Sequence, residues 1–159
     1  MKIKIIAIGK IKENYLKEGI NEYIKRLKPY VDITIEEVND SPIKDNPSFG
    51  NIEKAKNEEC LRALKHIKDS DYLITLDMNK KEMDSVEFAS FLEKKFELGR
   101  SSITFIIGGS YGLSDSIKAR ANDSISLSKM TFLHQMTRLI LLEQIYRGFK
   151  INNHETYHK

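Results

Sequence analysis

Glycine-rich and polar residues follow three apolar segments of this chain, and each of these places could hold a ligand. The first is Gly108-Gly109-Ser110-Tyr111-Gly112, which comes directly after an apolar run. Glycines between a strand and a helix let the backbone approach a ligand and present free amide groups. The Gly-Gly-x-x-Gly spacing is not the dinucleotide fingerprint, and Ser128 stands where that fingerprint needs an acidic residue. There is no Walker motif either, which argues against ATP hydrolysis.

The second and third places are Leu76-Asp77-Met78 and a polar elbow at residues 127–132. Ligands of parallel α/β sheets bind beyond the carboxyl ends of the strands. The three segments together could therefore wall one pocket, suited to an adenosine-like cofactor with a small zwitterionic tail. Tight turns without a ligand would explain each segment singly, but all three together less well.

The last three residues, Tyr157, His158 and Lys159, combine an aromatic ring, an imidazole and an amine. A tyrosine can stack on a nucleobase, and a histidine with a pKa near ~6.5 can accept a proton at neutral pH. A lysine can pair with a phosphate or a developing anion. The alternative is a disordered polar tail, because chain ends usually fray. For His134, beside the elbow, we expect a local hydrogen-bonding role.

Alternating strands and helices must position these residues. Periodicity and end signals predict an α/β fold with a mainly parallel sheet and helices on both faces. The predicted strands are 2–9, 32–38, 71–77, 102–107 and 124–128, and the predicted helices are 14–28, 51–68, 84–98, 114–121 and 136–149.

Several residues should mark the ends and contacts of these elements. We expect caps at Asn51 and Ser114, and a capping box between Asp84 and Glu87. A long loop at 39–50 and a turn at 79–81 should connect elements, and Gly99 should end a helix. Gly19, inside a helix, suggests close packing against another backbone.

The last helix is apolar on every side at Leu139-Ile140-Leu141-Leu142, which is unusual for a surface helix. The face opposite the core would leave two or three large side chains in water, each losing about 1.5–3 kcal/mol. We therefore expect a second subunit of a homodimer to cover it. A neighbouring helix of the same chain is the alternative.

The chain has 159 residues, and we expect residues 1–159 to form one domain. Its net charge of +3 permits a nucleic-acid partner without demanding one. The single cysteine, Cys60, excludes an intramolecular disulfide and a cysteine-cluster metal site, and we expect it to be a buried thiol. We find no signal peptide and no apolar run near the ~20 residues that span a membrane. These features predict a cytoplasmic protein without a metal.

Taken together, these motifs resemble the RlmH family, the ribosomal RNA large-subunit methyltransferases of the SPOUT class. The resemblance covers essentially the whole chain. It rests on Ile6-Ala7-Ile8-Gly9-Lys10, Glu22-Tyr23-x-Lys25-Arg26-Leu27-x-Pro29-Tyr30, Gly108-Gly109-x-x-Gly112-Leu113, Leu127-Ser128-x-Met130-Thr131-Phe132-x-His134-Gln135, Arg138, Glu143, Gln144, Tyr146-Arg147 and Tyr157-His158-Lys159. The sequence departs from the family at Leu133, where proline is usual, and at His154 and Thr156, where Gly or Asn and a small residue or proline are expected.

The resemblance implies a C-terminal trefoil knot, an obligate homodimer and S-adenosyl-L-methionine as the methyl donor. The implied reaction is methylation of N3 of a pseudouridine (position 1915) in 23S rRNA of the assembled 70S ribosome. The implied cofactor-binding residues are Leu76, Gly108, Leu127, Ser128, Lys129, Met130, Thr131 and Phe132.

On this reading His158 is the candidate base, Tyr157 a stacking or positioning group, and Lys159 a partner for a phosphate or oxyanion. Arg138 is a second candidate for the carbonyl of the base or a phosphate. Lys10, Lys12, Lys80 and Lys81, with the tail, are candidate ribosome contacts. Two alternatives remain open: a non-catalytic dimeric ribosome- or RNA-binding module, and an α/β enzyme that uses a nicotinamide or nucleotide cofactor.

Overall fold

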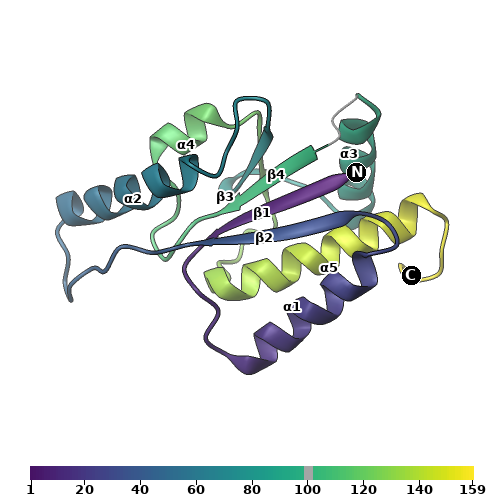
Figure 1. Cartoon of the computed structure of the whole chain (residues 1–159), viewed down its shortest axis with the longest axis horizontal. Coiled ribbons are helices and arrows are strands. Elements are labelled where there is room, and N and C mark those ends of the chain that lie inside the picture. The colour runs from purple at the N-terminus through teal and green to yellow at the C-terminus, as the bar shows by residue number, and fades with distance from the viewer. Residues whose placement is uncertain (99–101) are drawn as a thin grey trace.

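A five-stranded parallel sheet with the order β2-β1-β4-β3-β5 forms the centre of the protein. The structure is a computed structural model and describes residues 1–98 and 102–159. The strands are β1 (Lys2–Ile8), β2 (Asp32–Val38), β3 (Tyr72–Glu82), β4 (Ser102–Ile107) and β5 (Asp123–Ser126). The helices are α1 (Asn14–Leu27), α2 (Phe49–Leu64), α3 (Ser85–Glu97), α4 (Asp115–Arg120) and α5 (His134–Asn152) (Figure 1). The predicted α/β class is confirmed.

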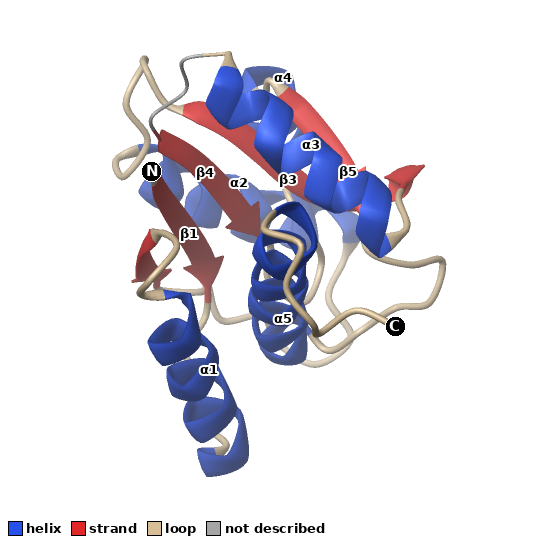
Figure 2. Ribbon diagram, turned by 90° about the vertical axis from the view of Figure 1, so that its right-hand side faces the viewer, coloured by secondary structure: helices blue, strands red, loops and turns tan. Residues whose placement is uncertain are grey.

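Helices cover both faces of the sheet, which explains the uninterrupted apolar runs of the central strands. Because side chains alternate along a strand, Ile3 and Ile5 of β1 face one layer of helices while Ile6 and Ile8 face the other. Helices α1, α3 and α5 pack on the first face, and α2 and α4 pack on the second. Figure 2 shows α3 and α5 in front of the strands, with α1 below β1. Cys60 is buried in the second layer, as predicted.

The predicted capping box of α3 is confirmed. Asp84 Oδ1 accepts a hydrogen bond from the Glu87 amide at 2.8 Å, and Glu87 Oε2 accepts one from the Asp84 amide at 3.0 Å. Ser114 is the N-cap residue of α4, as predicted, but its hydroxyl bonds to that of Ser116 at 2.8 Å and makes no bond to the backbone of α4. The expected helix end at Gly99 lies outside the described residues.

Three other predicted boundaries are wrong. Helix α2 is capped by Ser48 in place of Asn51, and it ends at Leu64, four residues early. The predicted turn at 79–81 continues β3, since its last residues pair with β5 beyond an irregularity in register. Helix α5 runs from His134 to Asn152 and is longer than predicted at both ends. For β3 it is pairing with a strand distant in sequence that extends the element beyond its local signals.

Two of the four residues in the apolar centre of α5 are buried by the chain itself. Leu141 and Leu142 are 0% exposed, and α5 packs against α1 and α3 as well as the sheet. The alternative of a neighbouring helix is therefore correct for Leu141 and Leu142, whereas Leu139 and Ile140 are partly exposed and the expected dimer contact there stays a prediction. At Gly19 a Cβ would lie 3.1 Å from both Cδ atoms of Leu139. The close packing predicted there exists, but against a side chain and not a backbone.

Candidate cofactor pocket and C-terminal tail

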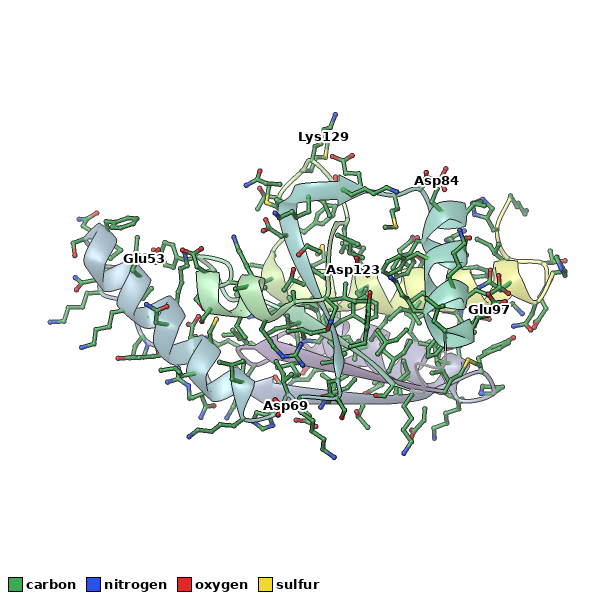
Figure 3. All side chains as sticks on the ribbon, turned by 90° about the horizontal axis from the view of Figure 1, so that it is seen from above. Glu53, Asp69, Asp84, Glu97, Asp123 and Lys129 are labelled. Atoms are coloured by element: carbon green, nitrogen blue, oxygen red, sulfur yellow. The ribbon has the colours of Figure 1, made fainter. Side chains whose placement is uncertain are left out.

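The middle of β3 and the segments that follow β4 and β5 line one pocket of about 710 Å³. Pairing of β3 with β4 stops at Thr75, so Leu76 and the residues after it turn away from β4 toward the pocket. The lining residues are Lys56, Leu76, Asp77, Met78, Asn79, Ile107, Gly108, Gly109, Ser110, Tyr111, Gly112, Leu113, Lys118, Ser126, Leu127, Ser128, Met130, Thr131, Phe132, Leu133, His134 and Thr137. Seven of the eight cofactor positions implied by the resemblance are among them. Lys129 is not, and Figure 3 shows its side chain projecting outward from the protein.

The glycine turn after β4 is closed so tightly that two of its glycines cannot be replaced freely. A Cβ on Gly108 would lie 2.7 Å from the carbonyl carbon of Gly112. Gly112 has a φ of +83°, in the left-handed region that favours glycine, and its amide bonds to the Gly109 carbonyl at 3.1 Å. The pocket wall at this point is therefore backbone, which can approach a ligand closely.

Short polar contacts fix the elbow between β5 and α5. The Ser128 hydroxyl accepts a hydrogen bond from the Met130 amide at 3.0 Å, and the Ser126 hydroxyl donates one to the Ser128 carbonyl at 3.0 Å. The Thr131 hydroxyl donates to Met78 Sδ at 3.4 Å and so joins the elbow to the end of β3. Two walls of the pocket are thereby tied together.

The pocket carries one ion pair on its wall. Asp77 Oδ2 and Lys118 Nζ are 3.2 Å apart, and the Asn79 amide donates to Asp77 Oδ1 at 3.2 Å. Burial raises the pKa of Asp77, but the Asn79 amide and Lys118 outweigh it, so the pKa lies below its usual value. Asp77 is therefore a carboxylate at neutral pH.

Sequence reasoning gave no role to three lining residues, Lys56, Lys118 and Thr137. Lys118 lies in the short helix that follows the glycine turn, so its place near the turn could have been inferred. Lys56 comes from a helix far away in sequence, and no local pattern indicates its place at the pocket.

His134, the first residue of α5, also lines the pocket and is half-buried. Burial and the charge of Arg138 lower the pKa of His134, so its imidazole is neutral at pH 7. The local hydrogen bond expected for it is not found within residues 1–98 and 102–159.

Arg138 lies beneath the loop that follows β1 and does not line the pocket. It is 2% exposed, donates to the Gly9 carbonyl at 3.2 Å and pairs with Glu37 at 3.2 Å. Its Nε has no partner among the described residues. Its contacts hold the loop after β1 against the end of β2.

The C-terminal tail folds back over α5 instead of fraying. The Tyr157 ring packs edge-on against Tyr146 at 4.9 Å, and its hydroxyl lies 3.3 Å from that of Tyr23. The Arg147 guanidinium lies 4.7 Å from the centre of the Tyr157 ring and 3.4 Å from His158 Nδ1. Sequence reasoning assigned no role to Arg147, although its spacing of four residues from Glu143 is that of a helical ion pair.

The reversal of the tail explains one departure from the family. His154 has a φ of +55°, in the left-handed region that Gly adopts without strain and that Asn, Asp and His adopt more often than other residues. The following residue, Glu155, is anchored by the Tyr30 hydroxyl at 2.9 Å and by an ion pair with Lys150. These contacts hold the chain in the strained turn.

The tail and the pocket of one chain lie at different parts of α5. Thr137 lines the pocket, whereas the tail contacts Arg147, ten positions further along the helix. At about 1.5 Å per residue, this separates the two places by about 15 Å. In Figure 1, α5 begins near the carboxyl ends of the strands and the C-terminus lies toward its other end.

No group of three or more His, Cys, Asp or Glu side chains in the part of the chain that the structure describes could hold a metal ion. None of the described helices is long and apolar enough to cross a membrane.

Known proteins resemble this chain over its full length. Proteins named ribosomal RNA large subunit methyltransferase H from Carboxydothermus hydrogenoformans, Acetivibrio thermocellus and Enterococcus faecalis are 50%, 51% and 46% identical to it, each over 100% of both chains. A probable methylase family protein from Haemophilus influenzae shares the fold at 12% identity, with a TM-score of 0.54 over 99% of this chain and 70% of that one.

The family described as predicted SPOUT methyltransferase matches residues 1–158. The parallel sheet, the pocket at its carboxyl edge and the full-length relatives agree with that match. The chain belongs to the SPOUT methyltransferase family and, within it, to the RlmH group.

Proposed function

We propose that this protein methylates ribosomal RNA of the large subunit with S-adenosyl-L-methionine as the donor. The observation that carries the proposal is the one pocket that β3 forms with the segments following β4 and β5. The names of its full-length relatives supply the substrate class. The finer proposal is transfer to N3 of a pseudouridine in 23S rRNA of the assembled 70S ribosome, in the cytoplasm, by a homodimer with a C-terminal trefoil knot.

The residues of the pocket suit this donor. Leu76, Leu127 and Phe132 offer apolar walls for an adenine ring, and the glycine turn offers backbone that a ligand can approach closely. When bound, S-adenosylmethionine supplies an activated methyl group on its sulfonium. The task of the protein is to hold the acceptor nitrogen in line with that methyl group and to remove its proton.

We assign the second task to the tail. His158 accepts the imide proton, Tyr157 positions the base, and Lys159 pairs with a phosphate or the developing oxyanion. Arg138 is buried and paired with Glu37, so we do not assign it a direct contact with RNA. Its proposed role is to support the loop after β1 from below.

The separation of tail and pocket supports a homodimer. Since the tail of one chain contacts α5 about 15 Å from the part that lines its own pocket, we infer that it serves the pocket of a second subunit. The exposed lysines Lys10, Lys12, Lys80 and Lys81 are candidate contacts with ribosomal phosphates. RNA recognition would then depend on shape and charge more than on base sequence.

The test uses ribosomes, labelled donor and mass mapping of the RNA product. A chain lacking residues 157–159 should bind S-adenosylhomocysteine like the intact protein and transfer no methyl group. Full activity of the shortened chain would refute the role of the tail. Ribosome binding by the intact protein without any transfer would favour the non-catalytic binding module instead.

A mixing experiment tests whether the tail acts across subunits. The shortened chain is combined with a full-length Gly108→Val chain, whose pocket wall is blocked by a side chain. Each is expected to be inactive alone, and mixed dimers should regain activity because one intact tail meets one intact pocket. If the mixture stayed inactive while mixed dimers were present, the tail would have to act within its own chain.

A further inference from the structure

The proposed reaction gives no role to the ion pair on the pocket wall, between Asp77 and Lys118. Among the described residues that line the pocket, Asp77 is the one carboxylate, and the charged amines are Lys56 and Lys118. Lys56 pairs with Glu53 of its own helix at 2.9 Å. Only the Asp77–Lys118 pair places both signs of charge on the lining itself.

The proposed donor carries charges of both signs at one end. Its amino-acid head group has an α-ammonium and an α-carboxylate. Burying either charge in a pocket is unfavourable in free energy unless a group of opposite charge pairs with it. From standard bond lengths and angles, the nitrogen and an oxygen of such a group are about 3 Å apart. The Asp77 and Lys118 charges are 3.2 Å apart, which is a matching separation.

The positions of these residues also suit an exchange of partners. Asp77 directly follows Leu76 within β3, just beyond the part of the strand that pairs with β4, and Lys118 lies on α4 just beyond the glycine turn. The Lys118 side chain is 39% exposed, so it can move, whereas that of Asp77 is 11% exposed and is fixed by the Asn79 amide. In the free protein the two charges compensate each other.

We propose that Asp77 and Lys118 recognise the amino-acid head group of the donor, with the carboxylate of Asp77 on the ammonium and the amine of Lys118 on the carboxylate. This inference rests on the proposed function and deepens it. The two residues would let the pocket discriminate between ligands that share adenosine but differ in the head group. The bonds formed are charge-assisted hydrogen bonds, and no covalent step is involved.

The experiment compares two ligands by calorimetry. S-adenosylhomocysteine has the head group, and 5′-methylthioadenosine lacks it while keeping the adenosine and the sulfur. Asp77→Asn and Lys118→Met should each weaken binding of the first about 10- to 100-fold, the usual effect of losing a charged hydrogen bond. Binding of the second should be unchanged.

Asp71 provides a matched control at the opposite end of the same sheet. Like Asp77, it pairs with one lysine, Lys4 at 2.8 Å, and accepts one backbone amide bond, from Lys68 at 3.0 Å. Its side chain is 10% exposed, against 11% for Asp77. Asp71→Asn should therefore cost similar stability and change the affinity for neither ligand.

The other possible outcomes would overturn the proposal. Equal loss for both ligands would assign Asp77 to the ribose and overturn the proposal, and so would unchanged binding in both variants of the pair. A loss that Asp71→Asn reproduced would make the effect one of general stability and would also overturn it. If the wild-type protein bound neither ligand, the proposed function would fall together with this assignment.

Discussion

Replacing Gly108 by alanine should disrupt the pocket through a steric clash with backbone. The added Cβ would lie 2.7 Å from the Gly112 carbonyl carbon, 2.9 Å from its oxygen and 3.0 Å from its Cα. Restoring an ordinary contact of 3.4 Å requires the Gly112 backbone to move by about 0.7 Å. No side-chain rotation can provide this movement, because all three atoms belong to the main chain.

The expected cost is about 1–3 kcal/mol of folding stability, the usual range for overpacking in a tight site. The affinity for S-adenosylhomocysteine should fall by tenfold or more, since loss of one good hydrogen bond costs about 1 kcal/mol and the whole turn is displaced. Urea denaturation measures the first quantity and calorimetry the second.

Two glycine variants separate steric from conformational effects. Gly112→Ala places its Cβ in open space but strains a φ of +83°, which should cost about 1–2 kcal/mol. Gly50→Ala, in the first turn of α2, meets its nearest neighbouring atom only at 3.9 Å and should be neutral or stabilising. If Gly108→Ala matched Gly50→Ala in stability and affinity, the argument from close backbone approach would be refuted.

Three further variants test the core, a buried acid and the tail. Leu142→Ala should lower the free energy of unfolding in urea by about 2–5 kcal/mol because Leu142 is 0% exposed; a change under about 1 kcal/mol would contradict its burial within one chain. Burial raises the pKa of Glu59 above its usual 4.5, so the folded state binds the proton more tightly than the unfolded state does. The free energy of unfolding therefore falls as the pH rises from 4.5 through the raised pKa. Glu59→Gln keeps an acceptor for the Ser41 amide and should be the more stable protein at pH 8, with the difference shrinking toward pH 4.5; a constant difference across that range would refute the assignment. Burial, the Tyr23 hydroxyl and the Glu143 charge raise the pKa of Tyr157 above its usual 10.0, so Tyr157→Phe should leave the phenolate absorbance at pH 10 unchanged.

Local signals located every element but often missed its ends. The capping box at Asp84 was predictable because both partners lie within one turn of each other. The continuation of β3 through residues 79–81 was not, since the strand that pairs with it, β5, lies more than 40 residues away. A polar sequence that would form a turn in isolation is held as a strand by that neighbour.

The candidate site likewise has features that the sequence indicates and contacts that it does not. Its glycine turn, elbow and terminal aromatic–imidazole–amine trio stand out by composition, so residue types and spacing alone indicate them. The Asp77–Lys118 pair and the contact of Arg147 with the tail join residues from different elements. No spacing along the chain indicates such pairs.

The sequence by itself determined the α/β alternation, the family and the segments that carry chemistry, because these depend on residue types and short-range periodicity. Only the tertiary structure decided what covers the last helix and where the tail lies. From the sequence alone Leu141 and Leu142 look like interface residues, yet they are completely buried in the core of a single chain. Burial depends on which distant segments pack together, and that is a property of the whole fold and not of any one stretch.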